Sequence, residues 1–109
     1  MSGKRSSTKG HSFEREIANM FRTLGFDARR HLEYQDGEAN GVDIANTGPF
    51  RIQCKRHKDY APISAINEIQ LAGIPLLITK GDRKPAMAVL PLDALMKILA
   101  DVGEAYEEV

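Results

Sequence analysis

The chain has 109 residues, of which 42% are hydrophobic and 28% charged, and its formal net charge at pH 7 is zero. This length predicts one compact domain with a single hydrophobic core. No apolar run approaches the roughly 20 residues that span a bilayer, and residues 1–10 lack the apolar segment of a secretory signal, so we expect a cytoplasmic protein without a membrane partner. The single cysteine, Cys54, excludes an intrachain disulfide, and no spacing of Cys and His resembles a zinc site.

The charges are unevenly distributed along the chain. Residues 1–60 contain 11 Lys and Arg against 8 Asp and Glu, whereas residues 61–109 contain 4 against 7. A zero net charge argues against a strongly electrostatic partner, but the excess of positive charge in the first half favours one surface that faces a polyanion.

The two ends of the chain differ from its middle in composition. Residues 1–10 are small, polar and basic, which predicts a flexible N-terminal arm. The sequence leaves open whether this arm is simply disordered or contacts phosphates. We expect the folded domain to occupy residues 11–102 and an acidic tail to occupy residues 103–109.

A helix is the first element expected after the arm. Ser12 offers an N-cap oxygen, and Gly25 is a residue at which a helix commonly ends. Glu14 and Glu16 fall in the first turn, where the helix dipole favours acids, and Glu14 lies beside the apolar stripe, where it could face inward. The apolar residues at helical spacing, which we expect to be buried, are Phe13, Ile17, Met20, Phe21 and Leu24.

A strand over residues 26–32 and a polar loop over residues 33–41 lead to the most informative segment. Residues 42–45 and 50–55 read as two strands, and Asn, Thr, Gly and Pro at residues 46–49 predict a turn between them. Side chains alternate along a strand, so Gln53 and Lys55 share one face while Cys54 packs on the other. Asp43 can project from the neighbouring strand towards Gln53 and Lys55. A carboxylate, an amide oxygen and an ammonium in one place would suit a hard cation beside a phosphate, although solvated surface side chains are the alternative.

The second half predicts a helix, two strands and a last helix. Residues 62–72 read as a helix with Ile63, Ile66 and Ile69 buried, and residues 74–79 and 86–90 read as strands. The order of elements predicts an α/β fold with a central mixed β-sheet flanked by helices. No glycine-rich phosphate loop follows a strand, so we expect no nucleotide cofactor. The last helix, over residues 91–102, has a predicted core stripe of Leu92, Leu95, Met96, Leu99 and Val102.

Five short stretches together resemble one nuclease family. They are GHSFERE at residues 10–16, LGF at 24–26 with Arg30 beyond it, VDI at 42–44, IQCK at 52–55 and GIPLL at 73–77. In this order they resemble the PD-(D/E)XK nuclease superfamily, and most closely its archaeal-type Holliday junction resolvases. The resemblance implies a restriction-endonuclease-like fold, and a small nuclease of this kind suits a prokaryotic or phage-infected cell.

The chain departs from the family pattern in two places. Gln53 stands where those resolvases have Glu, and the loop before Asp43 is longer than theirs. An amide oxygen can still bind Mg²⁺, but Glu14 and Asp43 supply two negative charges where the family has three. We therefore expect a site with one divalent ion, or with a second ion that is held only weakly.

The resemblance also implies how the site would work. Glu14, Asp43, Gln53 and Lys55 would be the catalytic residues. Mg²⁺, for which Mn²⁺ would substitute, would be held by the first three of these residues and by the backbone carbonyl of Cys54. Lys55 would orient or deprotonate the attacking water and neutralise the scissile phosphate.

DNA is the partner that the resemblance implies, especially branched DNA with four-way junctions, cut by a homodimer. The alternatives are an endonuclease of the same superfamily that cleaves flaps, single strands or duplex, and a branched-DNA-binding module that has lost activity. Guanidinium groups pair well with phosphate oxygens, so Arg15 and Arg30 are the first candidates for DNA contacts. The other candidates are Lys4, Arg5, Lys9, Arg56 and Lys58.

Overall fold

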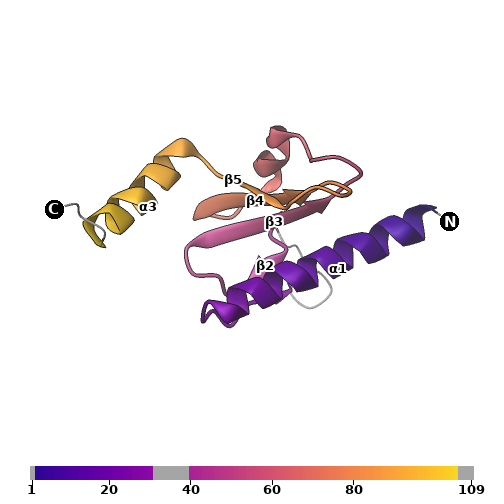
Figure 1. Cartoon of the computed structure of the whole chain (residues 1–109), viewed down its shortest axis with the longest axis horizontal. Coiled ribbons are helices and arrows are strands. Elements are labelled where there is room, and N and C mark those ends of the chain that lie inside the picture. The colour runs from indigo at the N-terminus through magenta and orange to yellow at the C-terminus, as the bar shows by residue number, and fades with distance from the viewer. Residues whose placement is uncertain (1, 31–39, 106–109) are drawn as a thin grey trace.

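The computed structural model describes the backbone of residues 2–30 and 40–105 and the side chains of residues 9–30 and 40–103. The described elements form a five-stranded sheet with helices packed against it (Figure 1). In chain order they are α1 (Ser2–Thr23), β1 (Arg29–Arg30), β2 (Ile44–Ala45), β3 (Phe50–Arg56), the 3₁₀-helix η1 (Ile63–Glu68), β4 (Ile74–Lys80), β5 (Met87–Val89) and α3 (Leu92–Ala105).

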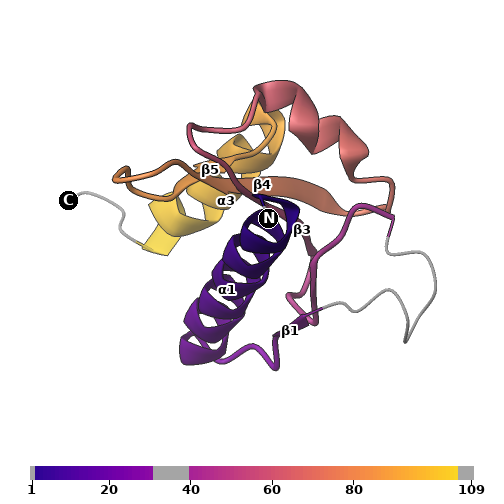
Figure 2. The ribbon, with the colours of Figure 1, turned by 90° about the vertical axis from the view of Figure 1, so that its right-hand side faces the viewer.

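The sheet is mixed, as the order of elements predicts. Its strands lie in sequence order from β1 to β5, with β3 and β4 parallel and every other neighbouring pair antiparallel. A parallel pair needs a crossover, and the segment that contains η1 provides it. α1 lies along one face of the sheet and η1 lies on the other side (Figures 1 and 2). The predicted α/β class is therefore confirmed.

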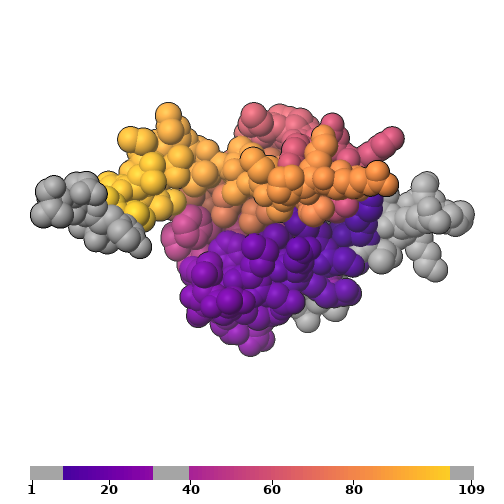
Figure 3. Space-filling model, viewed as in Figure 1, coloured from indigo at the N-terminus to yellow at the C-terminus, as the bar shows by residue number. Residues whose placement is uncertain are grey.

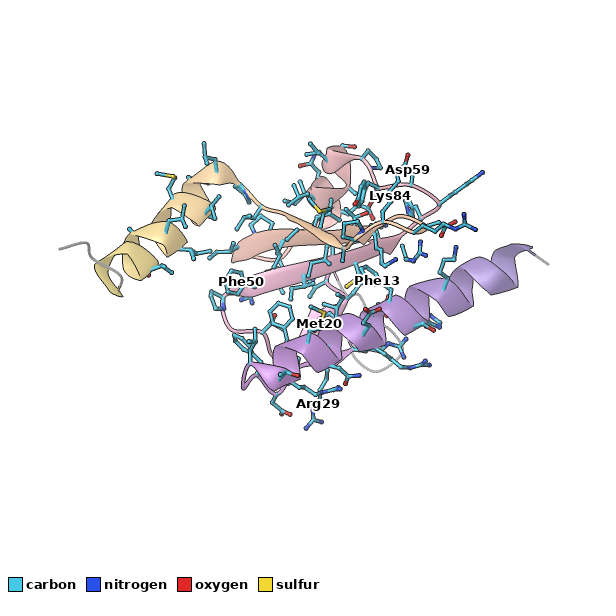
Figure 4. All side chains as sticks on the ribbon, in the orientation of Figure 1. Phe13, Met20, Arg29, Phe50, Asp59 and Lys84 are labelled. Carbon is cyan, nitrogen blue, oxygen red and sulfur yellow. The ribbon has the colours of Figure 1, made fainter. Side chains whose placement is uncertain are left out.

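The main hydrophobic core fills the space between α1 and the sheet. Phe13, which Figure 4 shows between α1 and β3, is buried together with Ile17 and Ala18 of the same helix. These residues pack on Ile44 of β2 and Ile52 of β3, both of which are fully buried. Contacts between the first helix and the central hairpin thus determine where α1 lies.

The end of α1 follows from Gly25, as the sequence predicts. Gly25 has a φ of 101°, which a residue with a Cβ adopts at a cost. The amide of Phe26 donates to the carbonyl of Phe21 at 3.2 Å, and that of Gly25 donates to Arg22 at 2.9 Å, which is the Schellman pattern. The rings of Phe21 and Phe26, with centroids 5.6 Å apart, supply the hydrophobic contact that accompanies it.

Two expectations about α1 are wrong. The helix begins at Ser2 rather than at Ser12, because apolar spacing locates only the buried part of a helix, and a polar stretch that contains no proline can continue it. Met20 and Leu24 are 56% and 74% exposed. The buried face is rotated away from them and is centred on Ile17 and Ala18, and this rotation turns Glu14 inward.

The predicted hairpin of β2 and β3 is confirmed. Ile44 pairs with Ile52, and the Thr47 hydroxyl donates to the Phe50 carbonyl at 2.8 Å across the turn. Ile52 and Cys54 face α1, whereas Gln53 and Lys55 point to the η1 side, as the alternation of a strand requires. Of the strand expected over residues 26–32, the structure shows β1; residues 31–39, including most of the expected loop, lie outside the described residues.

The crossover contains a short 3₁₀-helix instead of the α-helix predicted over residues 62–72. Ile63 is 71% exposed, so its predicted burial is wrong, and Ala65 is the buried residue of η1. Ala65 packs with Ala61 against Leu77 of β4. The amide of Ala61 donates to the Thr79 hydroxyl at 2.8 Å, which fixes the start of the crossover to the sheet.

The last helix is present, but its predicted core stripe is wrong. α3 extends away from the sheet (Figure 1), and in the space-filling view it protrudes beyond the body formed by α1 and the strands (Figure 3). Ala94 is buried, whereas Leu92, Met96, Leu99 and Val102 are exposed. A stripe of apolar residues identifies an amphipathic helix, but it does not say whether another element covers that stripe.

Burial predicts how two matched substitutions differ. Ile52→Ala should lower the free energy of unfolding by about 2–5 kcal/mol, because it empties space in a closed core. Leu24→Ala, at an exposed leucine, should change it by no more than about 0.5 kcal/mol. Urea denaturation of both variants measures this difference. Equal losses of stability would contradict the packing of α1 on the hairpin.

Candidate active site

Asp43 lies at the point where β2 and β3 separate. Its backbone amide donates to the Ile52 carbonyl at 2.7 Å, which continues the strand ladder by one bond. At the next position of the ladder, the Asp43 side chain replaces the backbone as acceptor: its Oδ2 accepts a hydrogen bond from the backbone amide of Cys54 at 2.8 Å. The N–H and C=O of one strand residue point to the same side, so the Cys54 carbonyl also faces the Asp43 edge of β3.

The surroundings of Asp43 disfavour its negative charge. Its pKa is raised from 3.8 to about 6, chiefly by burial and also by the charges of Glu14 and Glu68, against the opposing effects of the Cys54 amide and the Lys55 ammonium. Asp43 is therefore a carboxyl group that an additional cation would stabilise in its ionised form.

Glu14 approaches Asp43 from α1, on the helix face that the core turns inward. Its Oε1 accepts the Nε of Arg30 at 3.2 Å, and both side chains are largely buried. Glu14 also contributes, after burial and Asp43, to raising the pKa of the Cys54 thiol far above its usual range. The thiol is thus protonated and buried, which agrees with a packing role for Cys54 rather than a nucleophilic one.

Gln53 and Lys55 lie together on the opposite face of β3. Gln53 is only 5% exposed, and its amide is oriented so that its nitrogen donates to the Gly41 carbonyl and its oxygen accepts Lys55 Nζ at 3.1 Å. The reverse orientation would bring two carbonyl oxygens into contact. The structure thus places the predicted Gln53 and Lys55 in direct contact, one strand away from Asp43.

Glu68, at the end of η1, belongs to the same cluster although the sequence did not identify it. Its Oε1 accepts a hydrogen bond from Lys55 Nζ at 2.9 Å. The sequence contained one signal that could have pointed to Glu68: the crossover between two parallel strands must pass over a face of the sheet, so an acid in it can reach that face. Residues 57–73 contain two acids, Asp59 and Glu68. Asp59 instead pairs with Lys84, and Figure 4 shows these two side chains together.

Comparison with known proteins now identifies the family. Residues 5–73, more than half of the chain, match the model of the family Mrr_cat, described as restriction endonuclease. The chain belongs to this restriction endonuclease family. The family is of the PD-(D/E)XK type, which confirms the predicted superfamily and fold. No curated protein matches the chain.

The match makes the chain a nuclease domain whose substrate is DNA. It does not extend to the closer resemblance to Holliday junction resolvases, which stays a prediction. None of the helices that the structure describes is long and apolar enough to cross a membrane.

The oxygen atoms near Asp43 suit a hard divalent cation that is bound by carboxylate, amide and backbone oxygens together. Within residues 9–30 and 40–103, no three side chains of His, Cys, Asp or Glu are grouped closely enough to hold an ion. A cation would therefore also need amide or backbone oxygens, which hard cations accept. Gln53 and the Cys54 carbonyl are such oxygens, and the raised pKa of Asp43 fits a neighbouring positive charge.

The predicted DNA-binding residues of this nuclease differ in their exposure and in their ion pairs. Lys9 and Arg56 both contact Asp82, at 3.0 and 2.8 Å, and Arg30 pairs with Glu14. Arg15 and Lys58 are exposed. The side chains of Lys4 and Arg5 lie outside the described residues. A role in DNA binding stays a prediction for all seven residues.

The raised pKa of Asp43 predicts a pH-dependent effect of Asp43→Asn. With a folded pKa of about 6 against a model value of 3.8, the folded state keeps a proton that the unfolded state loses, so the contribution of Asp43 to stability falls as pH rises between these values. Asn should raise the free energy of unfolding by up to about 3 kcal/mol near pH 7.5 and by much less near pH 4. Urea denaturation in EDTA at both pH values measures this. Equal effects at both would contradict the assigned cause.

Proposed function

We propose that this nuclease is a Mg²⁺-dependent endodeoxyribonuclease, in which Mn²⁺ substitutes for Mg²⁺. The observation that supports this proposal best is the proximity of Asp43, Gln53 and Lys55 across β2 and β3. Lys55 and the Gln53 oxygen are 3.1 Å apart, and both Lys55 and Glu14 affect the pKa of Asp43. A carboxylate, an amide oxygen and an ammonium so close together supply what phosphodiester hydrolysis requires, namely cation ligands and a group for the phosphate.

Each residue has a distinct role in this proposal. Asp43, Glu14, Gln53 and the Cys54 carbonyl would hold the ion, which supplies charge neutralisation at the phosphate and an acidified water. Arg30, 3.2 Å from Glu14, would keep the Glu14 side chain directed towards Asp43. Lys55 would contact the scissile phosphate and orient the attacking water, because its ammonium lies on the face of β3 that Gln53 shares.

The substrate is the finer part of the proposal. The resemblance to archaeal-type resolvases favours four-way junctions, resolved by paired symmetric nicks. The restriction endonuclease family instead favours linear duplex DNA. A branched-DNA-binding module that has lost activity is the weakest alternative, because Asp43 and Lys55 are both present at the proposed site. DNA as the substrate agrees with the predicted cytoplasmic location.

Cleavage with Lys55→Ala tests the proposed chemistry. We expect this variant to lose cleavage in Mg²⁺ by at least about 100-fold while it binds DNA within about threefold of the wild type, since Lys55 acts at the reacting phosphate. Lys97→Ala, at an exposed lysine of α3, is the matched control and should cleave normally. Asp43→Asn should be inactive. Unchanged cleavage by Lys55→Ala would remove Lys55 from the mechanism.

The same assay assigns the substrate if a mobile four-way junction, a flap, a single strand and a linear duplex are compared. Faster cleavage of the junction at symmetric positions supports the resolvase assignment. Equal rates on junction and duplex would contradict it. Tight binding of branched DNA with no cleavage in Mg²⁺ or Mn²⁺ would favour the module without activity.

A two-fold homodimer is part of the resolvase proposal, because two symmetric cuts require two active sites related by a two-fold axis. β4 lies between β3 and β5, and its pairing with β5 at residues 77–79 leaves little of its edge for a second copy. α3 is the better candidate, since the side chains that its apolar stripe exposes include Leu92, which is 70% exposed. Pairing of α3 with its copy would cover this stripe.

Leu99→Lys tests this assembly. The wild type should behave as a dimer in light scattering at the concentrations used for cleavage, and the variant should be a monomer because the charge would be buried in the interface. Leu24→Lys places the same charge at an exposed leucine of another surface and should leave the dimer intact. A monomeric wild type, or a dimeric Leu99→Lys variant, would contradict pairing through α3.

A further inference from the structure

The carboxylate of Glu68 lies within the site, although none of the stretches that resemble the nuclease family contains it. Its Oε1 is 2.9 Å from Lys55 Nζ and 3.3 Å from the terminal atom of Gln53 that faces Lys55. Its negative charge also contributes to the raised pKa of Asp43. Glu68 therefore acts on three of the residues to which the proposed function assigns roles.

The oxygens of Glu68 and Gln53 are arranged around a cation in this structure. With the amide oriented as above, the oxygen of Gln53 and Oε1 of Glu68 are 3.3 Å apart, and the ammonium of Lys55 contacts both. Two adjacent ligands of an octahedral Mg²⁺ with bonds of about 2.1 Å would be about 3.0 Å apart. The pair thus has nearly the spacing of two oxygens that share a hard cation.

The backbone around Glu68 is fixed at both ends of η1. The amide of Gln70 donates to the Asn40 carbonyl at 2.8 Å, and Ala61 is bonded to Thr79 of β4. Gly41, with a φ of 77°, lies directly against the backbone of Glu68, where a Cβ would overlap the Glu68 carbonyl. Only glycine permits this approach, two residues before Asp43. The segment that carries Asp43 and the segment that carries Glu68 are therefore held together.

We propose that Glu68 is a cation ligand, which supplies from the crossover the carboxylate that β3 lacks at Gln53. This inference rests on the proposed metal-dependent function. Glu68 would bind the ion together with Asp43 and the amide oxygen of Gln53, so the site would not need a third carboxylate within reach. Lys55 holds Glu68 in this structure, and once released from it Lys55 would be free to approach the scissile phosphate. The half-exposed side chain of Glu68, 53% accessible, has room for that exchange.

Binding of Mn²⁺ to the full chain, measured by electron paramagnetic resonance of the free ion, tests this role without cleavage. Glu68→Gln should raise the dissociation constant at least about tenfold. Glu16→Gln, the same change at an exposed acid of α1, is the matched control and should leave it unchanged. The double variant Gln53→Glu with Glu68→Gln should return to within about threefold of the wild type, because it restores a carboxylate at the same place.

The outcomes separate this inference from the function on which it rests. If Glu68→Gln binds Mn²⁺ as well as the wild type does, Glu68 is no ligand, while the proposed function stands. If binding weakens and Gln53→Glu does not restore it, Glu68 acts only through Lys55 or the fold, and the inference is again wrong. A wild type that binds no Mn²⁺ and cleaves no DNA would overturn the proposed function itself. Circular dichroism checks that each variant is folded.

Discussion

The site depends on one hydrogen bond between a side chain and the backbone, from the Cys54 amide to the Asp43 carboxylate at 2.8 Å. In a continued hairpin, a β2 carbonyl would accept that amide. Here the side chain accepts it, so the amide stays satisfied while the chain before Asp43 turns away from β3. This separation leaves room beside β3 for Asn40 and Gly41, which meet the end of η1.

The two faces of the sheet contribute different parts of the site. α1 covers one face and brings Glu14, because the buried side of that helix is centred on Ile17 and Ala18. The crossover lies on the other face and brings Glu68 to Lys55. Asp43, at the edge where the hairpin opens, is influenced by acids from both faces. The proposed site is thus assembled where the layers meet, and its residues come from several elements.

Charge in the site is balanced by pairs. Arg30 pairs with Glu14 and Lys55 pairs with Glu68, which leaves Asp43 as the acid with a raised pKa between them. These pairs offset the charges of Glu14 and Glu68, since an uncompensated negative charge near Asp43 would make its ionised form more costly. A cation or a phosphate that enters must rearrange these pairs, so the ion pairs are also the natural points at which binding changes the site.

The sequence by itself determined the features that depend on local chemistry. Gly25 ended the first helix, residues 46–49 made the turn, and period-two alternation placed Gln53 with Lys55, because glycine conformations and strand geometry act over a few residues. It also brought Asp43 beside them, since adjacent strands of a hairpin must pair. Only the tertiary structure decided the contacts of Glu68 and Arg30, the rotation of α1 and the exposure of α3. These depend on how segments far apart in the chain pack, and neither apolar spacing nor helix propensity carries that information.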